Sequence, residues 1–287
     1  MGPPVLVEEV AGGKALRRFA DLPVVLHGGD PRFAWPVLAW ERYRLDPRRN
    51  PYFDRGDGAY FLARRHGRPV GRITAHVDGP GERGRFGFWC VEDDDDVASA
   101  LVDAACAWLR DQGCGSVEGP SSFTAAEEEG VLVAGFDAPG ATGRPWHPAS
   151  QSILLEALGF EVVRHAPTWR LPAREWGSER PMVDDPPGHA GRHHDRRLVL
   201  EGVAAVPDLS GALRGASLRG SWALARRVRA AAWETATIVR VEDDPADAVP
   251  ALCTAAARAG YASVLSPWSP DPASDPETVH AVFARQL

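Results

Sequence analysis

A strand–helix–strand pattern between residues 85 and 119 constrains the fold of this chain most. Residues 85–91 (RFGFWCV) are β-prone, and the acidic run 92–96 leads directly into a helix with apolar side chains at positions 97, 101, 104, 105 and 108. This spacing has the 3.6-residue period of an amphipathic helix, and Gly113 supplies its end. Residues 115–119 (GSVEG) then read as a short buried strand. Two strands joined through one helix run parallel in a sheet, so we expect a β-α-β crossover.

The residues around this crossover predict a mixed α/β fold. Residues 59–63 and 70–77 are β-prone, and the turn at 66–69 between them contains Gly and Pro, which predicts a hairpin. We expect a strand at 5–10 and a helix at 14–22 before the hairpin. After the crossover we expect a long irregular loop, a helix and two strands, at residues 120–148, 149–158, 160–164 and 168–171.

A breaker-rich segment divides the chain. Residues 173–197 are rich in Pro, Gly, Arg and His and have no apolar period, which is typical of a linker. We therefore expect a domain at 1–174, a linker at 175–197 and a smaller βα region at 198–287. The elements predicted in this last region are a helix at 221–235, a strand at 237–241, a helix at 246–259, a strand at 262–265 and a final helix from about 276.

The C-terminal region repeats part of the sequence pattern of the crossover. The sequence VEDD stands at 91–94 and again at 241–244, and each copy is followed by an Ala-rich stretch and a glycine. The region is therefore either a partial second repeat of the first domain or a cap on it, since acidic residues before Ala-rich helices also coincide by chance.

Charge and composition limit the function classes. The formal net charge is -7, which argues against nucleic acid as the main partner because phosphate binding draws on clustered positive charge. The apolar stretches are far shorter than the roughly 18 to 20 residues of a membrane span. The N-terminal residues show no signal for export, so we expect a cytoplasmic protein. The 4 cysteines include no CxxC pair and predict neither a disulfide framework nor a zinc site.

Short motifs carry a resemblance to a known family. They are NPYF at 50–53, GRPVGRI at 67–73, GFW at 87–89, GP at 119–120 and GVLVAGFD at 130–137. With the crossover between them, residues 5–172 resemble the GNAT superfamily, the acetyltransferase-like fold. The resemblance implies that the strands of the crossover splay apart and that an acyl-CoA thioester lies in the gap. The implied cofactor-binding groups are the backbone of Cys90, Val91 and Glu92.

The pyrophosphate site of that family departs from its usual pattern here. The resemblance implies a Gly-rich loop whose amides, at the start of the helix, receive the pyrophosphate, but Asp93–Asp96 occupy this place. Carboxylates can cap the same amides themselves. A pyrophosphate ~5 Å from one fixed carboxylate would meet about 3 kcal/mol of repulsion at a dielectric near 20. We therefore expect coenzyme A to be excluded from the usual pose.

The acid of the family's chemistry is also replaced. The resemblance implies a tyrosine on the helix after the crossover that protonates the leaving thiolate, and the corresponding stretch here is Trp146–Gln151 (WHPASQ). His147 or Ser150 are then the candidates for this position, since an imidazole titrates near neutral pH. The alternative is that His147 only caps the helix.

Further candidates lie at the end of the second crossover strand. Glu118 is an ionisable residue in a mostly buried strand, which predicts either an ion pair or a role as base. Ser121 and Ser122 follow it, and a Ser–His pair oriented by Glu118 is conceivable, although no G-x-S-x-G elbow is present. Glu127–Glu129 predict a solvated face or a contact for a substrate amine.

These features support an acyltransferase that moves an acyl group from a thioester to the amine or hydroxyl of a small molecule. Glu118 is the expected base or orienter and His147 the acid. Two alternatives stay open. One is a GNAT-like fold used for cyclisation, hydrolysis or elimination on a specialised metabolite without coenzyme A. The other is a ligand-binding protein without catalysis.

Overall fold

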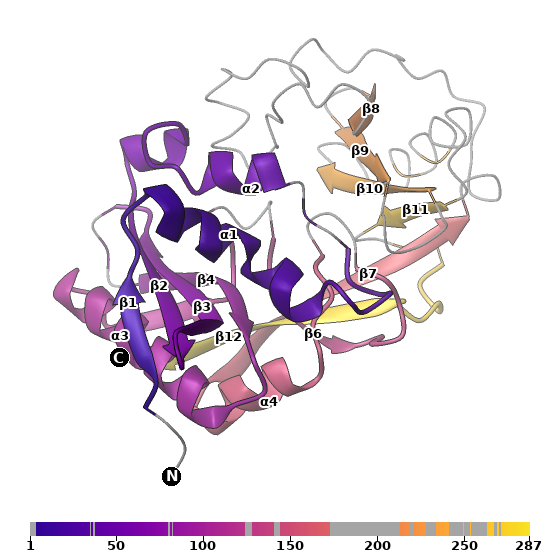
Figure 1. Cartoon of the computed structure of the whole chain (residues 1–287). Coiled ribbons are helices and arrows are strands. Elements are labelled where there is room, and N and C mark those ends of the chain that lie inside the picture. The colour runs from indigo at the N-terminus through magenta and orange to yellow at the C-terminus, as the bar shows by residue number, and fades with distance from the viewer. Residues whose placement is uncertain are drawn as a thin grey trace.

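A single broad sheet forms the framework of the protein (Figure 1). The computed structural model describes residues 4–34, 36, 38–79, 81, 83–123, 128–140, 144–172, 213–218, 221–227, 234–240, 249, 253, 263–266, 269 and 271–287. The helices are α1 (Gly13–His27), α2 (Leu38–Arg44), the 3₁₀ helix η1 (Pro51–Asp54), α3 (Asp95–Asp111) and α4 (Ser150–Ala157). The strands are β1 (Leu6–Glu9), β2 (Asp57–Arg65), β3 (Arg68–Val77), β4 (Arg83–Val91), β5 (Ser116–Gly119), β6 (Val131–Ala134), β7 (Glu161–Pro172), β8 (Leu213–Leu218), β9 (Ser221–Arg227), β10 (Glu234–Arg240), β11 (Ser263–Ser266) and β12 (Thr278–Gln286).

The strands follow the order β1-β2-β3-β4-β5-β12-β7-β11-β10-β9-β8 in a 12-stranded sheet, and β6 pairs with β12 beside this path. β4 and β5 run parallel around α3, which confirms the predicted crossover. Most other pairs are antiparallel, and the mixed α/β class is confirmed. The hairpin of β2 and β3 is also confirmed.

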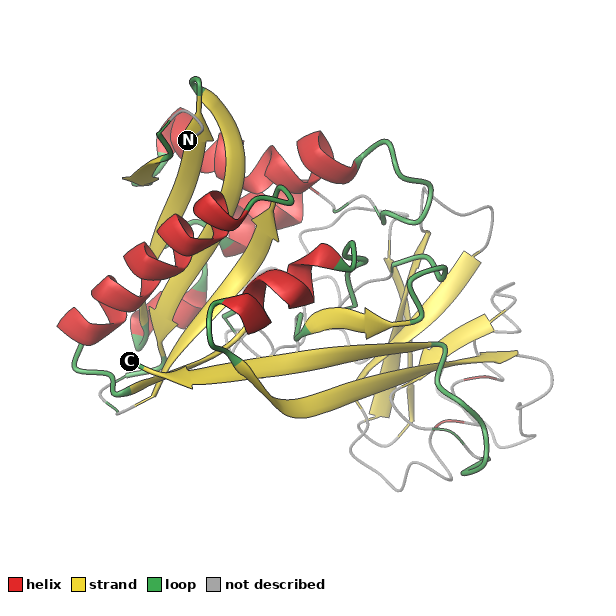
Figure 2. Cartoon of the chain, turned by 90° about the horizontal axis from the view of Figure 1, so that it is seen from below, coloured by secondary structure: helices red, strands yellow, loops and turns green. Residues whose placement is uncertain are grey.

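Helices cover both faces of the sheet's N-terminal half. α3 and α4 lie on one face and α1 and α2 on the other, as Figure 1 and Figure 2 show from two directions. The alternation of β2 explains the two layers. Ala59, Phe61 and Ala63 pack in the cluster that includes α3, whereas Tyr60 and Leu62 pack with α1. Since successive side chains of a strand point to opposite faces, one strand contributes to both cores.

The end of the chain departs from the sequence prediction. Residues from 276 were expected to form a helix, but 278–286 form β12, so this prediction is wrong. β12 lies between β5 and β7 and pairs antiparallel with both. The sheet that holds the crossover therefore takes one of its inner strands from beyond residue 197.

Two other predictions are corrected. The helix expected at 221–235 is wrong, because β9 and β10 occupy most of this stretch and pair antiparallel. The two strands expected at 160–164 and 168–171 are one strand, β7, whose first part pairs with β12 and whose last part pairs with β11. The linker at 175–197 lies outside the described residues, as does most of the helix expected at 246–259, of which Val249 and Cys253 are described, both helical and buried.

No helix among the described residues has the length and apolar character to cross a membrane.

Candidate functional site

The gap between β4 and β5 opens after a close approach of the two strands. Arg83–Arg85 pair with Ser116–Glu118, and the Ser121 amide donates to the Phe86 carbonyl at 2.8 Å. β4 then continues to Val91 with a kink at Phe88, whose φ is +50°, while β5 ends at Gly119. The edge of β4 beyond Phe86 is therefore free of strand pairing with β5.

Gly87 makes the close approach possible. A Cβ placed on Gly87 would lie 1.7 Å from the Ser121 carbonyl oxygen, which is far inside contact distance. Only a residue without a side chain fits there, because the clash is with backbone and not with a flexible side chain. The glycine of the GFW motif thus fixes the point from which the strands diverge.

The backbone of Val91 lies at this free edge. Its neighbour Glu92 donates its amide to the Val70 carbonyl of β3 at 2.9 Å, so in the alternating pattern of a strand the polar groups of Val91 face the gap. The side chain of Gln151 fills the position: the Val91 amide donates to its Oε1 at 3.2 Å, and its Nε2 donates to the Val91 carbonyl at 2.8 Å. Gln151 is fully buried in α4. Of the backbone groups that the resemblance implied, that of Val91 is bound to Gln151 and the Glu92 amide to β3.

The start of α3 is occupied as well. Asp94 is the N-cap and accepts from the Val97 amide at 3.1 Å. Its carboxylate also pairs with the Arg65 guanidinium at 2.5 Å, and Asp96 lies 3.6 Å from the same group. The acidic run therefore caps the helix, as expected. Arg65 offsets much of the electrostatic repulsion between these carboxylates and a pyrophosphate. The amides at the start of α3 that would bind an anion are instead capped by Asp94.

Glu118 lies away from the free edge. It stands opposite Arg85, and residues 85–91 at about 3.3 Å each span roughly 20 Å to Val91. Its carboxylate contacts Arg83 at 3.2 Å and Arg164 at 3.9 Å. Arg164 in turn forms a bidentate pair with Glu129 at 2.5 and 2.6 Å. These contacts give Glu118 a place in an ion-pair network on β5 and β7.

His147 belongs to a row of three histidines, of which His147 and His280 are buried and His27 is half-buried. Its Nδ1 accepts from the Leu132 amide at 3.3 Å, which places the ring hydrogen on Nε2. Burial lowers the pKa of His147 well below its usual range, with smaller contributions from His280 and His27. Burial also lowers the pKa of His27 and lowers that of His280 to about 4. All three imidazoles are neutral at pH 7, so His147 can donate a hydrogen bond but holds no extra proton.

His27 connects this row to β4. Its Nε2 lies 3.5 Å from the Cys90 thiol, and its ring centre lies 6.1 Å from that of Trp146 at a steep angle. Burial raises the pKa of Cys90 to about 11, which keeps the thiol protonated. His27 stands at the last turn of α1, so α1 brings a neutral base to the face of β4 opposite α3. Ser150 begins α4 and is half-buried.

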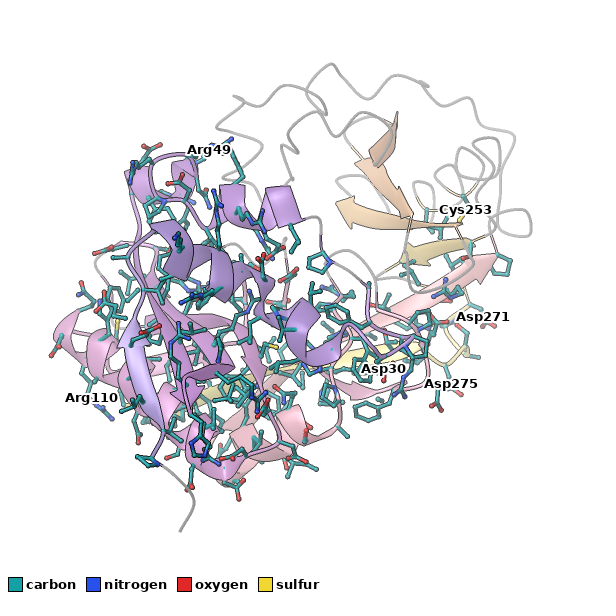
Figure 3. All side chains as sticks on the ribbon, viewed as in Figure 1. Asp30, Arg49, Arg110, Cys253, Asp271 and Asp275 are labelled. Atoms are coloured by element: carbon teal, nitrogen blue, oxygen red, sulfur yellow. The ribbon has the colours of Figure 1, made fainter. Side chains whose placement is uncertain are left out.

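Asp30 lies in the loop just beyond α1 (Figure 3). Its carboxylate binds the Arg32 guanidinium at 2.7 and 2.9 Å. Arg32 lies over the Trp146 ring at 4.6 Å from its centre and donates to the Phe136 carbonyl at 3.2 Å. The loop after α1 is thereby bound to the segment that precedes α4.

A buried charge cluster lies on the same face of the sheet. Arg44 of α2 is 2% exposed and binds Glu41 at 2.7 Å, Glu128 at 2.9 Å and the Ser122 hydroxyl at 2.9 Å. The Ser122 hydroxyl donates to Glu128 at 3.2 Å. Arg44 also lies over the Phe88 ring at 4.6 Å, at the kink of β4. Within this cluster Ser122 is engaged by charged groups, and Ser121 Oγ finds no partner among the described residues.

Arg72 of β3 extends the cluster towards Cys90. It is buried, and its Nη1 donates to the carbonyl of Phe19 at 2.8 Å and to that of Ala20 at 3.3 Å. Pro23 lies inside α1 and has no amide hydrogen to donate to Phe19, four residues earlier. The free carbonyl thus receives the guanidinium. Burial lowers the pKa of Arg72, while Cys90, Glu41 and Glu128 oppose that shift.

Sequence reasoning missed several of these residues. Gln151 lies in the stretch 146–151, which corresponds to the family's tyrosine. A polar amide in an otherwise apolar helix indicates a buried hydrogen-bond partner, and this signal could have identified it. Arg72 is a charge inside a β-prone run, which is the sign of a buried partner. His27 lay beyond the expected end of its helix. Among the described residues no group of His, Cys, Asp and Glu is arranged for a metal ion, and Glu127 lies outside them.

Two curated proteins are similar to parts of the chain. No protein family model matches the chain. It is 41% identical over 131 residues to the bacterial ceramide synthase of Caulobacter vibrioides (strain NA1000 / CB15N), over 43% of this chain and 34% of that protein. It is 34% identical over 165 residues to protein YghO of Escherichia coli (strain K12), over 54% of this chain and 41% of that protein. The chain thus spans less than half the length of these curated relatives.

Solved structures match over nearly all of the chain. A tandem GNAT protein from the clavulanic acid biosynthesis pathway matches with a TM-score of 0.63 at 12% identity, covering 99% of this chain and 98% of that one. The protein has a GNAT-like fold. A GCN5-related N-acetyltransferase from Kribbella flavida matches with a TM-score of 0.52 at 13% identity, over 99% of this chain and 71% of that one. At these identities the likeness concerns the GNAT-like fold alone.

Proposed function

We propose that the protein is an acyltransferase that moves an acyl group from a thioester to the amine or hydroxyl of a small molecule. The observation that carries this proposal is the edge of β4 beyond Phe86, which is not paired with β5 and where the amide and carbonyl of Val91 face the gap, held there by the Gln151 side chain. A strand edge of this kind offers paired hydrogen bonds to an extended ligand.

The acceptor class comes from the curated relative. Ceramide is the amide formed between a fatty acid and a long-chain amino alcohol, and the relative of this chain is a ceramide synthase. We therefore propose the primary amine of a long-chain amino alcohol as the acceptor. We place the polar end of the acceptor on the face of the sheet that holds the buried charge cluster. The Glu128 carboxylate and the Ser122 hydroxyl can accept hydrogen bonds from a neutral amine and a hydroxyl there.

The proposed reaction is a direct transfer. The amine nitrogen attacks the thioester carbonyl, the C–N bond forms and the C–S bond breaks, and the thiolate leaves. His27 accepts the proton that the amine loses, since its half-buried imidazole is neutral and lies beside β4. His147 donates a hydrogen bond through Nε2 and stabilises negative charge on the oxygen or sulfur. Glu118, the base expected from sequence, is proposed instead to hold Arg83 and Arg164.

Acyl-CoA is the donor to test first, although its thioester arm and its pyrophosphate do not fit the site equally well. The thioester arm matches the polar groups of Val91, whereas the pyrophosphate finds the α3 amides capped by Asp94. Purified protein is mixed with acetyl- or palmitoyl-CoA and either a long-chain amino alcohol or a short alkylamine. Thiol release and the mass of the amide product are measured. Amide formation with the long-chain base supports the proposal, and no thiol release above background with any pair contradicts it.

A matched pair of variants tests the base. His27→Gln should lower turnover about a hundredfold or more, because general-base catalysis contributes at least that factor. The control is His165→Gln, which changes an exposed histidine on β7 and should leave turnover unchanged. Equal turnover in both variants would exclude His27 as the base.

A second candidate function is chemistry without coenzyme A on a specialised metabolite. The observation that favours it is the occupation of the α3 amides by Asp94 together with that of the Val91 edge by Gln151. Its test is mass spectrometry of small molecules that copurify with the protein. A retained metabolite that lacks a thioester, and that the protein converts, would support this second function over the first.

A further inference from the structure

Gln151 makes a contact that resembles pairing between strands. One planar carboxamide accepts from the Val91 amide at 3.2 Å and donates to the Val91 carbonyl at 2.8 Å. The residue is 0% exposed, and it lies in the first turn of α4. Its side chain therefore closes the edge of β4 from the side on which β5 has ended.

A carboxamide can do this with one planar group. Val91 presents one donor and one acceptor on the same side of the strand, and Asn and Gln are the side chains that carry both complements on a single rigid plane. A buried backbone donor or acceptor without a partner costs about 1–3 kcal/mol. Removal of the carboxamide would thus leave Val91 in need of a new amide.

The acyl donor of the proposed function offers such a group. The pantetheine arm of coenzyme A carries secondary amides, each with one donor and one acceptor. The N–H and C=O of a trans secondary amide point in opposite directions, so the N–H of one amide of the arm and the C=O of the next would pair with Val91, as in a strand. They would compete with the Gln151 carboxamide for the same two groups.

We propose that Gln151 determines which donors enter the site, because its carboxamide has to leave Val91 before a donor arm pairs there. This inference rests on the proposed acyltransferase function. A thioester whose arm carries an amide replaces the lost hydrogen bonds. A thioester without an amide cannot replace the hydrogen bonds of Gln151, so Gln151 stays on Val91 and keeps that donor from the edge.

The test uses pantetheine, the arm without the nucleotide, so that Asp94 plays no part. Binding is measured by titration calorimetry for the natural protein, for Gln151→Ala and for Ile153→Ala. Ile153 is 61% exposed on the same helix and is the matched control. We expect Gln151→Ala to bind pantetheine at least tenfold more tightly than the other two proteins, and 2-mercaptoethanol, which lacks amides, to distinguish none of them.

A second measurement covers the case in which Gln151→Ala does not fold. In the natural protein, saturating pantetheine should shift the side-chain NH₂ resonances of Gln151 in ¹⁵N spectra and speed their exchange with water. Pantetheine binding with these resonances unchanged would overturn the proposal, and so would equal binding by Gln151→Ala and Ile153→Ala or the absence of binding to all three proteins.

The binding results separate this inference from the proposed function. Tighter binding of pantetheine by Gln151→Ala without amide synthesis by the natural protein would support the role of Gln151 and contradict acyl transfer. Amide synthesis with equal pantetheine affinity in both variants would support acyl transfer and contradict the role of Gln151.

Discussion

Replacing Asp94 with alanine and with serine separates the two roles of its carboxylate. The cap on the Val97 amide contributes about 1 kcal/mol, in the usual range for an N-cap. The ion pair with Arg65 adds about 0.5–1 kcal/mol, because both side chains are partly exposed to water, at 20% and 24%. Asp94→Ala loses both contributions, so we expect its free energy of unfolding to fall by about 1.5–2 kcal/mol.

Serine is the informative comparison. It is as good an N-cap as aspartate but carries no charge, so Asp94→Ser should lose only the ion pair, or about 0.5–1 kcal/mol. Urea unfolding followed by circular dichroism measures both variants against the natural protein. If Asp94→Ser were as unstable as Asp94→Ala, the hydroxyl would not be capping α3. If both matched the natural protein, the carboxylate would contribute nothing to the helix start.

Three further substitutions test other parts of the site. Arg44→Met should lower the free energy of unfolding by about 3–5 kcal/mol, because it leaves Glu41 and Glu128 without their cation; a loss in urea titration below 1 kcal/mol would contradict a buried network. Burial lowers the pKa of His280 to about 4, so the unfolded protein binds a proton at this residue before the folded protein does as the pH falls from 6.5. The natural protein should therefore lose about 3 kcal/mol of stability from this residue by pH 4. His280→Gln should show a correspondingly flatter curve of stability against pH, and parallel curves for the two proteins would refute the reasoning. Gly87→Ala should cost at least about 2 kcal/mol in the same assay, since its Cβ meets the Ser121 carbonyl, and an unchanged urea midpoint would show that the strands are not held so closely.

The crossover was predictable because its signals are local. The period of α3, the acidic run before it and Gly113 after it all lie within one stretch of chain, and the structure has the helix with Asp94 as its cap and Gly113 at φ +83°. A parallel arrangement of β4 and β5 then follows from the connection through one helix.

The C-terminal strands were not predictable in this way. The Ala- and Arg-rich composition of 221–235 favours a helix by intrinsic propensity, but the stretch is in β9 and β10, which pair with each other. β12 is set by its place between β5 and β7, and neither partner is near it in sequence. Tertiary pairing overrides local preference in both cases.

The contacts of the candidate site were not predictable from the sequence. The crossover motif predicts a site at the end of β4, and the contacts found there join residues far apart: Gln151 with Val91, and Arg44 with Ser122. No local pattern shows which buried polar groups meet, so His147 and Glu118 were favoured by residue type and by their positions along the chain. The structure instead gives His147 a backbone partner and Glu118 two arginines.

In the proposed function, Asp94 and Gln151 together would change the energetics of donor binding. Each satisfies backbone groups that would otherwise lack a partner, so a ligand that takes either position exchanges hydrogen bonds and does not add them. The net free energy from those contacts is then close to zero, and burial of the acyl chain and contacts with the acceptor have to supply the affinity. A long acyl chain or a long-chain acceptor contributes such apolar area, whereas an acetyl group does not. The hydrogen bonds that Asp94 and Gln151 form with the protein's own backbone would therefore favour long-chain substrates over acetyl transfer. This agrees with the acceptor class proposed from the curated relative.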